Sequence, residues 1–207
     1  KEIYHFAQID ENLVFAFLMR TDLTGIEASL TLSMARMAVR LITEELNVHS
    51  AYHCLKDLEE YFRINLRRKL GGDLVAMLIN VAEHKLFYSG CGNIKIVLIN
   101  SLNSSFSTLQ LPHCEPGSSE FHTCGSQETV FEPGMIAFAV SPVFSDICCS
   151  RLPDLLPLIT SCAKGGASLR DTMQAQVEQV CKGNLAESAS LIIAHYLPDE
   201  GGKPCSS

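Results

Sequence analysis

Residues 133–146 constrain the fold of this 207-residue chain more than any other stretch. A Pro-Gly turn signal precedes the apolar run Met135–Val140, which has the length and composition of a strand buried on both faces. Ser141 and Pro142 end this strand, because proline lacks an N–H group and disfavours helical geometry at the preceding residue. The chain is therefore expected to contain a covered sheet, with a loop at the carboxyl end of this strand.

Other segments show strand or helix periodicity in separate blocks. Two alternating or apolar runs joined by a short turn, 3–9 and 13–19, predict a β-hairpin. Further strands are predicted at 74–81, 85–89, 93–99, 105–111, 127–131 and 190–196, and helices at 26–46, 51–70, 144–162 (broken by prolines) and 168–181. Because strands and helices are grouped rather than alternating, an α+β layered fold is favoured.

The predicted helix 26–46 has an unusual end. Glu44 and Glu45 lie in its last turn, where the negative end of the helix dipole disfavours acids. This helix must therefore be stabilised by packing against the rest of the chain, since the charges at its end do not stabilise it.

Composition excludes several classes of function. The formal net charge is −7 and the pI is about 5.5, which argues against nucleic acid as a partner. No apolar run has the length of a transmembrane helix, so we expect no membrane segment in this chain and a cytoplasmic protein. The 9 cysteines show no regular spacing and suggest reduced thiols. His113, Cys114, His122 and Cys124 do not match the usual zinc spacing.

Four motifs resemble one known family. Asp22-Leu-Thr-Gly before a helix is similar to that family's Asp-Val-Ser-Gly, and the glycine turn at 88–93 to its Ala-Gly-x-Gly-Asn turn. Residues 132–140 resemble its Pro-Gly-Asp strand, and 187–192 its closing Asp-Asp-x-Thr-Leu strand. The family is the SpoIIE-like (RsbU/RsbX-type) branch of the metal-dependent PPM Ser/Thr phosphatases, and the likeness covers nearly the whole chain.

This resemblance implies a four-layer αββα sandwich, in which two antiparallel sheets are flanked by helix pairs. It implies one domain over 1–197, followed by a polar tail at 198–207 that we expect to be disordered. In active relatives a carboxylate cluster holds two Mg²⁺ or Mn²⁺ ions, which activate a water that attacks a phosphoserine or phosphothreonine.

Several positions depart from the family pattern. The family's strand-end Asp falls on Pro142, which has no ligand atom, and the following Gly on Val143. Glu2 and His5 stand in the places of the first-hairpin acids, and the closing Asp becomes Glu187. The resemblance therefore leaves Asp22, Glu187 and Glu2 as remnants of a metal site and assigns no catalytic residue. No cofactor is expected; the alternative is Mn²⁺ or Mg²⁺.

Each candidate also has an ordinary interpretation. Asp22 is equally suited to starting a helix, Glu187 to being a surface charge, and His5 to packing on a strand. Cys91 as a reactive thiol and Ser141 as a nucleophile both lack the neighbouring groups that such chemistry needs.

Two hypotheses about function follow. The first is a phosphatase fold that has lost its metals and binds a regulatory protein, such as a STAS anti-anti-sigma factor or a switch kinase, in a partner-switching pathway. The second is an active phosphatase with an atypical or single-metal site that dephosphorylates a STAS-type regulator. A homodimer or regulatory domain that makes contacts through the long helices is a further possibility. A phosphatase should need an acid at position 142, or one supplied from Asp146 by a shifted loop; Pro142 is the residue that distinguishes the two hypotheses.

Overall fold

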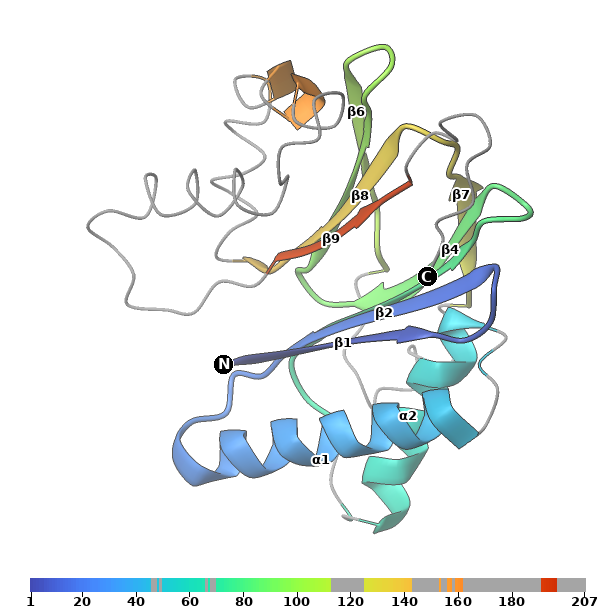
Figure 1. Ribbon diagram of the computed structural model, residues 1–207. Helices are drawn as coiled ribbons and strands as arrows, with labels where there is room; N and C mark the ends of the chain where they lie inside the picture. Colours follow the sequence, from blue (N-terminus) through green and yellow to red (C-terminus); the bar gives the residue numbers. More distant parts are fainter. Residues whose placement is uncertain are drawn as a thin grey trace, which may run out of the picture.

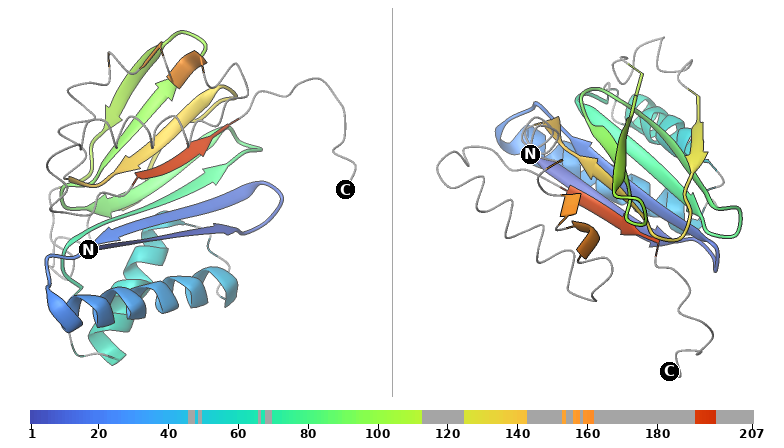
Figure 2. Two further views of the ribbon diagram at one scale, coloured as in Figure 1. Left: turned by 60° about the vertical axis from the view of Figure 1, so that its left-hand side comes forward. Right: turned by 90° about the horizontal axis from the view of Figure 1, so that it is seen from above.

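The computed structural model describes residues 1–45, 48, 50–65, 67, 70–112, 125–142, 153, 156–157, 159–161 and 191–196. Two antiparallel sheets lie face to face, and two helices cover the outer face of the first (Figures 1 and 2). Three layers are thus visible in the described part of the chain. This α+β arrangement with two antiparallel sheets confirms the predicted fold class.

The first sheet has the strand order β1-β2-β3-β4-β7. Its strands are β1 (Glu2–Gln8), β2 (Leu13–Arg20), β3 (Asp73–Asn80), β4 (Lys85–Cys91) and β7 (Gln127–Val130). The hairpin β1–β2 has the pairing that the sequence predicts, with Ile3 opposite Met19. Because β2 and β3 are internal strands, most of their side chains are buried: five of eight in β2 and seven of eight in β3.

The second sheet has the order β6-β5-β8-β9. Its strands are β5 (Lys95–Asn100), β6 (Ser105–Leu109), β8 (Met135–Val140) and β9 (Leu191–His195). The predicted strand Met135–Val140 is the internal strand β8, and five of its six residues are buried. The turn preceding β8 is held at Ser101, whose hydroxyl donates a hydrogen bond to the carbonyl oxygen of Gly134 at 2.6 Å.

The helices α1 (Gly25–Glu45) and α2 (Ala51–Asn65) pack on the first sheet. One core lies between these helices and the sheet and includes Phe15, Phe17 and Phe62. A second core lies between the two sheets and includes Leu18, Val75 and Ala137. Alternation along β2 and β3 divides each strand between the two cores, as expected for a sheet covered on both faces.

Some predicted boundaries were wrong. The helix predicted to run to residue 70 ends at Asn65, since Arg67 has a positive φ of 50° and Leu70 is not helical. Gly90 and Cys91, predicted as turn residues, lie in β4. A Cβ at Gly90 would lie 2.5 Å from the carbonyl oxygen of Leu74, so glycine is needed for the close approach of β3.

Other predicted elements lie outside the described residues. These are the loop at 113–124 with its Cys/His group, the helix at 168–181, most of the segment 144–162, and the tail 198–207. Among the helices of the described part, none is long and apolar enough to cross a membrane.

Candidate functional site

Charged side chains gather at one end of the sandwich, where β1 begins, β2 ends and β3 begins. Arg20 is the register partner of Glu2 on one side and of Asp73 on the other. These three residues therefore form a row across three strands. Leu18 and Val75, two positions along their strands from Arg20 and Asp73, lie in the core between the sheets, so the row is on the inter-sheet face.

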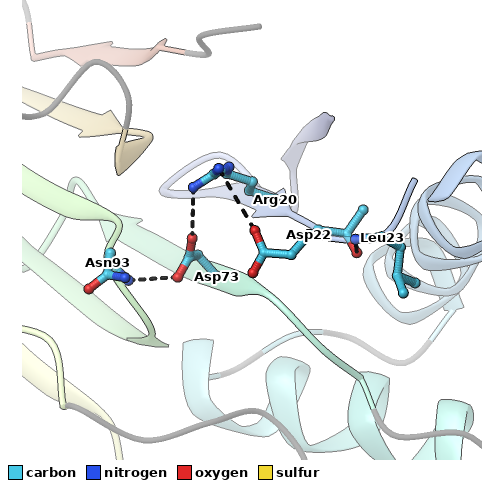
Figure 3. Close-up of polar contacts among 6 residues, drawn as sticks. Arg20, Asp22, Leu23, Asp73 and Asn93 are labelled. Carbon is cyan, nitrogen blue, oxygen red and sulfur yellow. Dashed lines mark hydrogen bonds and ion pairs between the residues drawn. The ribbon is translucent and has the colours of Figure 1, made fainter. Parts of the chain in front are cut away.

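Arg20 lies between two carboxylates (Figure 3). Its Nη1 is 3.5 Å from Oδ2 of Asp73, and its Nη2 is 3.8 Å from Oδ1 of Asp22. The side chain of Asp73 is 10% exposed, that of Arg20 21%, and that of Asp22 77%. The Arg20–Asp73 pair is thus largely removed from solvent, where an ion pair is screened less than at the surface.

The second oxygen of Asp73 is also occupied. The backbone N–H of Asn93 donates a hydrogen bond to Oδ1 of Asp73 at 2.8 Å. The neighbouring Gly92 has a φ of 86°, and a Cβ there would overlap the Asp73 carboxylate. The family-like glycine turn between β4 and β5 therefore serves here to seat Asp73.

The structure does not place Asp22 at a helix start, which is one of the two roles considered from the sequence; its role as a metal ligand stays a prediction. Helix α1 begins three residues later at Gly25, and the described partner of the Asp22 carboxylate is Arg20 rather than a helix N–H. The turn that carries Asp22 is fixed by its neighbours, because the N–H of Leu23 donates to Oγ1 of Thr21 at 3.3 Å. The helix-start interpretation of Asp22 is therefore wrong.

Glu2 is the register partner of Arg20, but its carboxylate makes no hydrogen bond to the described residues. Both carboxylate oxygens are buried, and neither accepts a hydrogen bond within the described part of the chain. Glu187, the third predicted ligand, lies outside the described residues. The structure therefore describes only two of the three predicted metal-binding residues, and metal binding by all three stays a prediction.

His5 is directed away from this site. Its Nε2 lies 3.1 Å from Oγ1 of Thr43 on α1, on the helix-covered face of the first sheet. Burial, reinforced by the positive charges of Arg36 and Arg40 and opposed by Glu44, lowers the pKa of His5 from its usual 6.5. His5 is thus a packing residue, as its ordinary interpretation predicts.

The carboxyl end of β8 lies at the same end of the sandwich. Val140, its last residue, is the register partner of Lys95, which follows Asn93 by two residues. Ser141 is fully buried, and Pro142 follows it. The resemblance drawn from the sequence aligns Pro142 with the family's strand-end acid, and a proline side chain has no ligand atom.

The described thiols are unsuited to catalysis. Cys91 is fully buried in the core between the helices and the first sheet. Cys54 is buried in the same core, and desolvation raises its pKa to about 12. Since the thiolate is the nucleophile, neither cysteine can act as one in the folded chain.

The described residues do not fit a two-metal centre. They contain no group of three or more His, Cys, Asp or Glu side chains that could hold a metal ion. Two of the carboxylates present, Asp22 and Asp73, share the permanently charged guanidinium of Arg20. Such a cation repels a divalent ion that approaches the same oxygens.

Sequence reasoning missed Arg20 and Asp73. The predicted strands stopped at residue 19 and started at residue 74, so both residues fell just outside them. Extending each strand by one residue places an arginine opposite an aspartate at a sheet end, which is the signal that could have found the pair.

Comparison with known proteins rests on structure alone. No protein-family model matches the sequence, and no curated protein does. The SiaA-PP2C domain of Pseudomonas aeruginosa superposes with a TM-score of 0.74 at 13% identity, over 94% of this chain and 80% of that chain. The RsbU and RsbW domains of a Mycobacterium tuberculosis protein give a TM-score of 0.73 at 13% identity, over 93% of this chain and 53% of that chain.

A third structure, RsbX in complex with magnesium, has a TM-score of 0.63 at 12% identity and covers 93% of this chain and 85% of that chain. The chain has the PP2C/PPM phosphatase fold. The resemblance to SpoIIE-like proteins, stated from four weak motifs, is thus confirmed for the fold. At these identities the comparisons do not assign an activity.

Proposed function

We propose that this chain is a phosphatase-fold regulatory module that binds a protein partner and has lost the metal centre of its fold. The observation that carries the proposal is the position of Arg20 between Asp22 and Asp73. At the sandwich end where the fold's active members are expected to hold cations between carboxylates, this chain holds a guanidinium. A fixed internal cation stabilises the carboxylates without a metal.

Two further features support the loss of the metal centre. Both oxygens of Asp73 are engaged, by Arg20 and by the Asn93 N–H. Pro142 stands where an additional acid is expected. The two cores remain fully packed around this end of the sandwich, so the changes affect the ligands and not the scaffold.

The proposed partner is a STAS-type anti-anti-sigma protein or a switch kinase of a partner-switching pathway. This part rests on the fold and on its neighbours, one of which carries RsbU and RsbW domains together. A second neighbour comes from a study of the bacterial stressosome that describes a modular system controlling secondary-messenger signalling. Both neighbours therefore support a signalling protein as the class of partner proposed for this chain.

A second candidate function is an active phosphatase with an atypical single-metal site. The observation that favours it is the 77% exposure of the Asp22 side chain, which leaves that carboxylate accessible from solvent. In this case Asp22 would leave Arg20 to bind the ion.

Hydrolysis of phosphorylated STAS protein in Mn²⁺ and in Mg²⁺ separates the two functions. The binding module should release no phosphate above the rate without protein, while binding the STAS protein or the switch kinase in calorimetry. Turnover that disappears in Asp22→Asn would establish the enzyme instead. Absence of both turnover and binding would contradict the proposed partner class.

A further inference from the structure

Helix α1 has a second apolar face besides the one in the core. Its buried side includes Ala28, Leu32, Ala35 and Val39. On the opposite side Ile26 is 80% exposed, Leu30 58%, Met37 70% and Leu41 45%; we call these four residues the α1 stripe. Single exposed apolar residues are ordinary, but four that follow one line of a helix mark an interaction surface.

The α1 stripe is accessible on the outside of the molecule. In Figures 1 and 2, α1 and α2 together form the outer layer beneath the first sheet, and α2 crosses α1 near its carboxyl end. At its carboxyl end the stripe joins a groove of about 170 Å³ between α1 and α2, lined mainly by Ala38, Leu41, Ile42, Tyr61 and Ile64. Ile64 on α2 is itself 57% exposed and extends the apolar surface.

The stripe is nearly symmetric about its own centre. Ile26 and Leu41 are equidistant from a point between residues 33 and 34, and so are Leu30 and Met37. A two-fold axis at that point, perpendicular to α1, therefore places Ile26 opposite the partner's Leu41 and Leu30 opposite the partner's Met37. This is the requirement for an isologous interface, in which residue i contacts j and j contacts i.

The charges at the two ends of α1 are also complementary. Lys1 Nζ donates to the carbonyl oxygen of Gly25 at 3.1 Å, which places an ammonium group at the start of the helix. The other end carries Glu45 and Glu44, of which Glu44 pairs with Arg40, and at the groove Asp57 and Glu60, of which Glu60 pairs with Arg63. Antiparallel packing brings these acids beside Lys1 and the positive dipole end of the partner helix, and so offsets their unfavourable position on their own helix.

We propose that two copies of this chain associate through antiparallel α1 helices, with Ile26 of each copy covering the groove beside Leu41 of the other. The proposal is independent of the metal site, which lies on the other face of the first sheet. The stripe extends over 15 residue steps, about 22 Å of helix. One helix per copy gives an interface at the small end of the range, so the dimer should dissociate on dilution.

Sedimentation velocity of the 207-residue chain over a wide concentration range provides the first test. The parent should change from monomer to dimer as concentration rises. Leu30→Glu or Met37→Glu introduces two charges into the interface and should weaken association at least ~100-fold. The matched control is Leu102→Glu, since Leu102 is 67% exposed in the turn between β5 and β6. A monomer at every concentration, or a dimer unaffected by both α1 variants, would overturn the proposal.

Disulfide trapping tests the antiparallel register. In this register Leu30 of one copy faces Met37 of the other, whereas the two copies of Leu30 are offset by about 10 Å, beyond the reach of a disulfide. Leu30→Cys and Met37→Cys should therefore each remain uncrosslinked when oxidised alone, and crosslink when mixed. The parent chain, oxidised in parallel, corrects for its native cysteines, and mass spectrometry identifies the linked peptides. Crosslinking of each variant with itself would contradict the antiparallel arrangement.

Discussion

At the scale of single residues, Asp73 carries two different interactions, and substitution can separate them. Asp73→Ala removes the ion pair with Arg20 and the acceptor of the Asn93 N–H, and should lower the free energy of unfolding by about 2 kcal/mol. Asp73→Asn retains an acceptor oxygen and should cost about half as much. Urea unfolding measures both values.

The matched control is Glu128→Gln, which breaks a more exposed ion pair with Lys85 and should change stability by less than about 1 kcal/mol. Equal losses for Asp73→Asn and Asp73→Ala would show that the Asn93 hydrogen bond contributes nothing. In that case Asp73 would be held by Arg20 alone.

The lowered pKa of His5 leads us to expect that the stability of the chain depends on pH. Because its pKa is lowered in the folded chain, the unfolded chain binds a proton more readily, and the free energy of unfolding should fall as pH decreases through 6.5. His5→Gln should flatten this part of the curve. His53→Gln, at an exposed position on α2, serves as the control. Parallel curves for the parent and His5→Gln would rule out His5 as the source.

Predictions about single residues succeeded where a local sequence motif or strand alternation was enough to place the residue. The Tyr88–Asn93 motif marked the connection between β4 and β5, although its residues up to Cys91 lie in β4, and His5 packs as an ordinary strand histidine. Arg20 and Asp73 were missed because their pairing depends on which strands are neighbours, and a linear pattern does not contain that order. The ordinary interpretation of Asp22, a helix start, was wrong because the local sequence does not show that Arg20 lies beside it.

At the scale of elements, the turn between β4 and β5 depends on glycine geometry. Gly92 has a φ of 86° and no space for a Cβ beside Asp73. Gly92→Ala should therefore destabilise the chain by more than about 1 kcal/mol. Gly71→Ala is the control, because Gly71 has no neighbouring atom within 4 Å of an added Cβ. Equal thermal stability of the two variants would contradict this role of Gly92.

Element boundaries were predicted least well at α2. The apolar positions of that helix identified it correctly, but the prediction extended it to residue 70, whereas the helix ends at Asn65. The strands were located to within a few residues, since alternation and apolar runs are imposed by burial on one or both faces.

At the scale of the whole molecule, grouping of strands and helices was sufficient to predict an α+β layered fold, and the family resemblance added the two antiparallel sheets. The pairing of β5 with β8 and of β4 with β7 joins distant segments and could not be obtained from periodicity. This strand order was not predicted. Whether the site binds metal ions did not follow from the fold, because this depends on which group neutralises the carboxylates of Asp22 and Asp73.

Calorimetric titration with Mn²⁺ tests the central claim most directly. It compares the parent chain with Asp22→Asn, and with Arg20→Met to remove the internal cation. Because the Arg20 guanidinium already neutralises the carboxylates, we expect no saturable Mn²⁺ binding to the parent up to millimolar concentration. The titration curves of the parent and Asp22→Asn should therefore be the same. Saturable binding of two ions at micromolar affinity to the parent, lost in Asp22→Asn, would contradict it and establish a working metal centre.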